Sequence, residues 1–166
     1  MIDAESGVEL LRYDRHQDFV QWVVFSLDGK SIVSQSHDGM VRAWDVLSGS
    51  DLFTRRGPFQ PESWDEQSAG FCSNYAFSPG GDLVVGGGVY KEQGELQFWN
   101  PANGETLRRL RGHTCLVSSL AFNRNTNRFI SGSLDGSVKV RDTATGNELL
   151  SLQAYTGILS LSVCPD

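Results

Sequence analysis

Four residues with chemically active side chains lie within five positions of "SQSHDGMVRAWD" (residues 34–45): Ser34, Ser36, His37 and Asp38. Serine, histidine and aspartate are the residue types of nucleophilic hydrolases, in which histidine takes the serine proton and the carboxylate orients the imidazole. Such a catalyst needs one triad, with its hydroxyl exposed in a cleft beside donors for an oxyanion. The segment therefore raises a hypothesis of hydrolysis that the surrounding elements must support or exclude.

The same residue types recur 97 positions further along the chain. "SGSLDGSVKVRD" (residues 131–142) agrees with the first segment at six of twelve positions, and the same offset aligns His16 with His113 and Phe25 with Phe122. A catalyst needs one triad and not one per structural unit, so the repetition favours a structural role for these residues.

A third copy of the repeat lies between these two. "YAFSPGGDLVVGGGVYKEQGELQFWNPANGETL" carries Phe77 and Trp99 in the places of Phe25 and Trp44, with three extra residues in the middle. Fragments of the same unit occur near both ends of the sequence, as "DAESGVELL" and "ILSLSVCPD". The sequence therefore starts and stops within a repeat.

Each repeat has the pattern of four short strands. The runs "VQWVVFS", "SIVSQ", "MVRAW" and "DLFT" are rich in β-branched and aromatic residues, and turn residues separate them. The dipeptides Asp38-Gly39 and Asp135-Gly136 suit the tight turn of a hairpin, because both residue types tolerate positive φ. Helical periodicity is lacking over any useful length. The pattern predicts a repeated, four-stranded antiparallel unit.

These features resemble the WD40 repeat family. The marks are the His before the first strand ("RHQDFV", "GHTCLV"), the "FSLDGK" and "FSPGGD" turns, the Ser-rich second strand, the Asp-Gly hairpin and the closing "AWD". The resemblance implies an all-β fold, a partial β-propeller of three complete four-stranded blades. A leading outer strand near residues 8–13 and a trailing inner strand near residues 158–163 are expected in addition. We expect one WD40 region over residues 1–166, with blade-equivalents at about 16–55, 72–110 and 113–153 and partial blades at 1–14 and 154–166.

In this family a His, a Ser or Thr, the hairpin Asp and a Trp form a hydrogen-bonded chain inside each blade. Carried over by position, the resemblance implies a structural network of His16, Ser34, Asp38 and Trp44 in the first blade, His113, Ser131 and Asp135 in the third, and Trp99 in the middle one. Ser36 and Ser133 share strand parity with Ser34 and Ser131, so both stay open for the Ser place. In the third blade Arg141 stands where Trp is expected.

The middle blade departs most from the pattern. It has Gly86 in the Ser place and Gln93 in the Asp place, and two insertions, at about residues 56–71 and 89–93, that should project from one face. Exposed aromatic residues among acidic ones are typical of a recognition surface. The candidate partner-binding face comprises Phe59, Trp64, Phe71, Tyr90 and Lys91, with His37, Phe19, Leu116 and Leu134 as second-rank contacts. In the alternative interpretation Trp64 and Phe71 fold back to cover the weakened blade.

Composition excludes several functional classes. Fourteen Lys and Arg against twenty Asp and Glu give a net charge of −6, which argues against nucleic acid or an anionic membrane as the main partner. No apolar run reaches the roughly 20 residues of a membrane span, and the N-terminus lacks a signal-peptide pattern. Three dispersed cysteines indicate neither a disulfide framework nor a zinc site. The Gly-rich segment 86–94 has neither P-loop nor dinucleotide-binding spacing, so no cofactor is indicated.

The sequence thus predicts a non-catalytic scaffold that binds protein or peptide partners through the loop-rich face of a propeller, in the cytoplasm or the nucleus. Fourteen strands do not complete a ring of about four to eight blades, so further blades from the same or another chain are expected. The favoured interpretation is a fragment of a longer propeller. Two alternatives remain: a propeller module of a larger regulatory protein, such as a ligase adaptor or signalling receptor, and an enzyme acting in a propeller channel.

Overall fold

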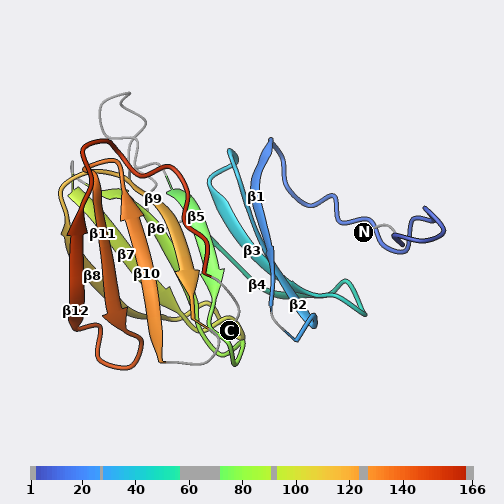
Figure 1. Ribbon diagram of the computed structural model, residues 1–166. Coiled ribbons are helices and arrows are strands. Elements are labelled where there is room, and N and C mark those ends of the chain that lie inside the picture. Colours follow the sequence, from blue (N-terminus) through green and yellow to red (C-terminus); the bar gives the residue numbers. More distant parts are fainter. Residues whose placement is uncertain (1–2, 27, 57–71, 91–92, 124–126, 164–166) are drawn as a thin grey trace.

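Three antiparallel sheets make up the fold. The computed structural model describes residues 3–26, 28–56, 72–90, 93–123 and 127–163, and within these ranges it contains twelve strands and no helix (Figure 1). Each sheet has four strands in sequence order. Blade 1 consists of β1 (Val20–Phe25), β2 (Ser31–Ser36), β3 (Met40–Asp45) and β4 (Asp51–Arg56). Blade 2 consists of β5 (Cys72–Phe77), β6 (Val84–Tyr90), β7 (Gln93–Trp99) and β8 (Thr106–His113). Blade 3 consists of β9 (Val117–Phe122), β10 (Arg128–Ser133), β11 (Ser137–Asp142) and β12 (Glu148–Gln153). The predicted all-β fold is confirmed.

The Asp-Gly dipeptides form the hairpins between the second and third strands of blades 1 and 3. Gly39 and Gly136 have φ of 80° and 81°, a left-handed conformation that glycine adopts without steric cost. The preceding aspartates accept hydrogen bonds from backbone amides two residues further on, at 2.8 Å in both hairpins. These turns set the register that brings hairpin and strand side chains together.

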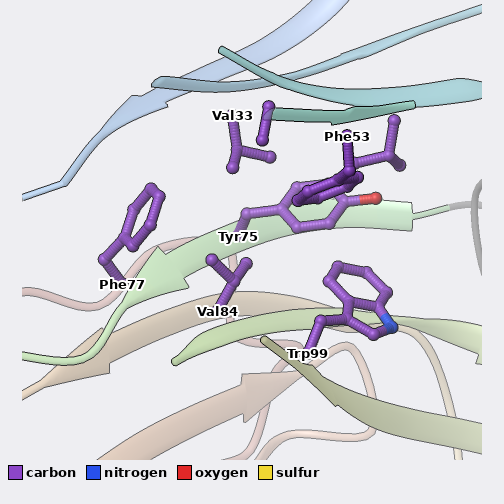
Figure 2. Close-up of a cluster of buried hydrophobic side chains, with 8 residues drawn as sticks. Val33, Phe53, Tyr75, Phe77, Val84 and Trp99 are labelled. Atoms are coloured by element: carbon purple, nitrogen blue, oxygen red, sulfur yellow. The ribbon is translucent and has the colours of Figure 1, made fainter. Parts of the chain in front are cut away.

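The blades pack face to face through apolar clusters. The first cluster joins blade 1 to blade 2 and is centred on Tyr75, whose ring lies between the aliphatic and aromatic side chains of both sheets (Figure 2). Its buried members are Val33, Val41, Ala43, Phe53, Tyr75, Phe77, Val84 and Trp99. The second cluster joins blade 2 to blade 3 and comprises Val85, Leu96, Phe98, Val117, Leu120 and Phe129. Burial of these faces holds the blades together as neighbours.

The two end segments differ from the prediction in one respect, because neither forms a strand. In the leading segment, Leu11 and Tyr13 pack against the cluster of Ile32, Trp44 and Val46. In the trailing segment, the Ile158 amide donates to the Ser133 carbonyl at 2.8 Å. Both segments thus lie against the faces of the end blades. Apart from an isolated β-bridge at Glu9, neither segment forms a ladder within its described residues.

No helix in the described part of the chain is long and apolar enough to cross a membrane.

Candidate functional site

In blade 1, three of the predicted network residues meet around one imidazole. His16 precedes β1, and its Nδ1 lies 2.9 Å from Asp38 Oδ2 while its Nε2 lies 2.9 Å from Ser34 Oγ. The Gln17 and Met40 amides also donate to the Asp38 carboxylate, at 2.9 and 2.8 Å. Burial alone would raise the pKa of Asp38, but these hydrogen bonds and His16 outweigh it and lower the pKa. The ionised carboxylate therefore ties the segment before β1 to the β2–β3 hairpin.

The structure distinguishes the two serines left open by the sequence. Ser34 contacts the imidazole, whereas the Ser36 hydroxyl donates to the Asp18 carbonyl at 2.9 Å and accepts from the Asp38 amide at 3.1 Å. Blade 3 has the same division, with Ser133 bonded to the Cys115 carbonyl and the Asp135 amide. The second serine of each pair therefore fixes the turn.

Trp44 does not join the hydrogen-bonded chain as predicted. Among the described residues its buried indole nitrogen has no hydrogen-bond partner, and the same holds for Trp99. Instead, the Trp44 ring stacks on Tyr13, with centroids 4.4 Å apart and an interplanar angle of 6°. The Tyr13 hydroxyl donates to Asp51 of β4. Trp44 thus binds the leading segment through its ring face, while Trp99 lies under the Arg55 guanidinium at 5.4 Å.

Blade 3 contains a variant of the same network. His113 Nε2 lies 2.8 Å from Ser131 Oγ, but its Nδ1 lies 2.8 Å from Ser137 Oγ and 3.6 Å from Asp135. Ser137 in turn donates to the Asp135 carboxylate at 2.6 Å, so it links the two groups. The sequence analysis missed Ser137. The available signal was a hydroxyl residue two positions after Asp135, where blade 1 has Met40.

Burial sets the charge states in blade 3. Burial lowers the pKa of His113 to about 4, against a partial opposing effect of Asp135. Burial alone would raise the pKa of Asp135, but hydrogen bonds from Ser137 and the Thr114 amide lower it to about 2. At neutral pH the pair is therefore a neutral imidazole beside a carboxylate.

Arg141 occupies the tryptophan place of blade 3 as a buried cation, with only 3% of its surface exposed. Its Nη2 donates to the Arg111 carbonyl of β8 at 3.1 Å and lies 3.6 Å from Glu148. Burial lowers its pKa, and Glu148 opposes that effect. The guanidinium thus links blade 3 to blade 2.

Blade 2 replaces the missing network by other means. A Cβ at Gly86 would lie 2.8 Å from the rings of both Tyr75 and Trp99, so these aromatic rings fill the space of the absent serine. On β7, buried Glu95 accepts from Gln97 at 3.0 Å and from Arg111 at 3.0 Å. Neither Glu95 nor Gln97 was singled out from the sequence, because nothing in the repeat pattern marks them.

The side chains of these networks bond to one another within their own blades. Both nitrogens of His16 and of His113 contact side chains of their own blade, and Ser34 and Ser131 are buried. A hydrolytic serine needs an exposed hydroxyl within reach of a substrate. Within the described residues no group of three or more His, Cys, Asp or Glu side chains could hold a metal ion.

The residues predicted as second-rank contacts lie beside the β2–β3 hairpin of blade 1 and the β10–β11 hairpin of blade 3. The His37 amide donates to the Phe19 carbonyl at 2.9 Å, and the Leu134 amide donates to the Leu116 carbonyl at 3.0 Å. Phe19 is 79% exposed and its ring meets the His37 ring edge to face at 6.1 Å. Of the first-rank residues, Tyr90 ends β6, and Phe59, Trp64, Phe71 and Lys91 lie outside the described residues.

Comparison with protein families and curated relatives gives consistent matches. The family model "WD domain, G-beta repeat" matches residues 7–45 and 104–142, two segments separated by the same 97 positions as the internal repeat. The chain is 30% identical over 166 residues to the U3 small nucleolar RNA-associated protein 15 homolog of Gallus gallus, covering 99% of the chain and 29% of that protein. It is 28% identical to periodic tryptophan protein 2 of Saccharomyces cerevisiae, covering 98% and 21%. The chain thus spans less than a third of either relative.

Solved structures show the same fold. The WD40 repeats of RRP9 match with a TM-score of 0.71 and 27% identity, over 87% of this chain and 42% of that one. The computationally designed Ika4 protein matches with a TM-score of 0.73 and 28% identity, over 95% of this chain and 88% of that one.

Proposed function

The chain belongs to the WD40 repeat family, and from that premise we propose that it is a non-catalytic scaffold that binds protein partners through the loop-rich face of a β-propeller. The observation that carries the proposal is the exposed pair of Phe19 and His37 beside the β2–β3 hairpin of blade 1. Large aromatic side chains contribute strongly to protein interfaces because they bury much area at little cost in side-chain entropy. Leu116 and Leu134 occupy the corresponding positions of blade 3 and form the same backbone hydrogen bond.

Affinity purification of the intact protein, followed by mass spectrometry, tests this proposal. We expect Phe19→Ala to reduce the recovery of specific partners at least several-fold, with an unchanged melting temperature. Leu47→Ala is the matched control, because Leu47 is 90% exposed and lies in the β3–β4 turn. Equal partner recovery with both variants would contradict the use of this face.

Exposed apolar residues on the end blades support the proposal that further blades complete a ring. Tyr75 and Phe77 of β5 are 2% and 5% exposed at the interface with blade 1, whereas Val23 and Phe25, their counterparts on β1, are about half exposed. Leu150 and Leu152 on β12 are exposed in the same way at the other end. We expect size-exclusion chromatography with light scattering of residues 1–166 to show self-association. A monodisperse monomer would argue against missing blades.

The names of the relatives narrow the proposed setting. Since the curated relatives include a U3 small nucleolar RNA-associated protein and a U3 snoRNP-associated protein-like chain of Arabidopsis thaliana, we propose a nuclear ribonucleoprotein assembly as the setting. Within it we propose proteins as the direct partners, because the chain has a net charge of −6. Imaging of the tagged protein tests this, and an exclusively cytoplasmic signal would contradict it. A propeller module within a larger regulatory protein is a compatible second candidate, since the chain matches under a third of either relative named above.

A further inference from the structure

The outermost strand of blade 2, β8, presents a free edge. It is the fourth strand of its sheet, and among the described residues no strand pairs with its outer side. It is also the longest of the twelve strands, with eight residues. An edge strand carries a row of unpaired backbone N–H and C=O groups, which an extended peptide can use to add a further strand.

Side chains of one charge surround this edge. Leu107, Arg109 and Arg111 alternate along β8, and all three are exposed. Arg55 of β4 brings a further guanidinium group, whose Nη1 donates to Thr106 Oγ1 of β8 at 3.1 Å. Burial is the main cause that lowers the pKa of Arg55, and repulsion from Arg109 contributes in the same direction, so the two cations interact.

Among the described residues, the ion pairs formed by the arginines of β8 do not balance these cations. In the described chain, Glu95 forms ion pairs with Arg111 at 3.0 Å and with Arg109 at 4.0 Å, but Glu95 is fully buried and carries a single charge. Arg55 donates to the Gly104 carbonyl rather than to a carboxylate. A cluster of positive charge therefore remains on a chain whose net charge is −6.

The other two outer strands, β4 and β12, contain acidic residues that form ion pairs. β4 contains Asp51, which lies 3.2 Å from Arg15, and β12 contains Glu148, which lies 2.9 Å from Lys139. β8 contains no acidic residue. Because like charges directly opposite each other destabilise a sheet, the arginines of β8 disfavour pairing with a second copy of β8, and opposite charges favour pairing with an acidic strand.

We propose that the outer edge of β8 binds an extended acidic segment of a partner protein as a fifth strand of blade 2. Alternate residues of the segment face the arginine row, with carboxylates opposite Arg109 and Arg111 and an apolar residue opposite Leu107. The free backbone edge and the apolar Leu107 favour a peptide over a nucleic acid, which would use only the charges. This rim surface involves neither Phe19 nor His37, so it is independent of the loop-rich face.

A fluorescently labelled octapeptide of alternating Val and Glu, with Val also at the position that faces Leu107, is titrated against the intact chain to test the proposal. We expect Arg109→Glu to weaken binding at least about tenfold, because the substitution replaces an attractive pair of opposite charges by a repulsive pair of like charges. Arg128→Glu is the matched control, because it makes the same charge change at an exposed position at the start of β10. This variant should bind the peptide with an affinity within about twofold of the unchanged protein. Circular dichroism establishes that both variants are folded. If Arg109→Glu does not fold, Arg109→Gln gives the same comparison with a smaller charge change.

Two further probes distinguish the mode of binding. An octapeptide of the same sequence with N-methylated amides at alternate positions should bind at least about tenfold more weakly, because it cannot complete the backbone ladder. Oligouridylate of equal charge should bind more weakly than the acidic peptide. Equal binding of the methylated peptide, tighter binding of oligouridylate, absence of peptide binding, or equal affinities for Arg109→Glu and Arg128→Glu would each overturn the proposal.

Discussion

Acidification from pH 7 to pH 4.5 should destabilise the protein through one buried histidine. His113 has a pKa of about 4 in the folded protein, because burial disfavours its charged form, against an ordinary value of 6.5. Between pH 6.5 and pH 4 the unfolded chain binds more protons at this histidine than the folded chain does. The stability contributed by the neutral imidazole is therefore fully present above about pH 6.5 and is lost as the pH falls towards 4.

The size of the effect follows from the shift in pKa. One pKa unit corresponds to about 1.4 kcal/mol, so the whole shift of His113 corresponds to roughly 3 kcal/mol. Neighbouring Asp135 is partly exposed, so solvent there screens part of the charge of a protonated imidazole. We therefore expect the free energy of unfolding to fall by about 2 kcal/mol at pH 4.5. For a chain of this size the loss lowers the melting temperature by about 4–8 °C.

Thermal unfolding followed by circular dichroism at several pH values between 7 and 4.5 measures this loss, with His113→Gln as the comparison. The variant should be less stable at pH 7 but should show a pH dependence smaller by about 2 kcal/mol. Asp135 contributes little in this window, because its stabilising effect is lost only as the pH falls from the ordinary pKa of 3.8 towards its folded pKa of about 2. Identical pH dependence in both proteins, or an NMR titration of the His113 ring near pH 6.5, would refute the reasoning.

Three further substitutions test the blade contacts. Ser34→Ala removes a buried hydrogen bond to the imidazole and should lower the melting temperature by about 2–4 °C, or about 1 kcal/mol; loss of a hydrolytic activity at unchanged stability would instead support catalysis. Gly86→Ser restores the residue of the other blades but places a Cβ 2.8 Å from the Trp99 ring, so urea unfolding should show a loss of about 1–3 kcal/mol, and a gain would contradict the packing account. Gly112→Ala places a Cβ 2.7 Å from Arg141 Nη2 and should cost about 1–2 kcal/mol; in an Arg141→Ala background the cost should fall, and an equal cost in a double-mutant cycle would show that the two residues do not interact.

The repeat itself was readable because its signals are local. The Asp-Gly hairpin depends on a dipeptide with access to positive φ, and the strand pattern depends on residues within a few positions of each other. A hairpin of fixed length brings Ser34 and Asp38 close together whatever packs around them. For this reason the chain's own sequence was enough to predict three four-stranded sheets and to question the catalytic interpretation of residues 34–45.

Contacts between residues distant in the sequence could not be predicted in the same way. Trp44 stacks on Tyr13 rather than bonding to Ser34, and Tyr75 and Trp99 fill the space at Gly86. Each of these contacts joins residues 11 or more positions apart in the chain, and which ring fills a given space depends on how the sheets pack. The repeat pattern specifies a type of residue at each place but not the neighbour it meets.

By itself, then, the sequence determined the unit of the fold: its strands, its turns and the places where polar residues recur, because short-range backbone geometry governs all three. The tertiary structure decided which partners the polar residues at those places contact in each blade. Ser137 links His113 to Asp135, Arg141 replaces an indole, and Glu95 is buried beneath the arginines of β8. The physical reason is that a buried polar group must find its partner wherever packing puts one, and that partner is set by neighbouring strands and blades rather than by the repeat.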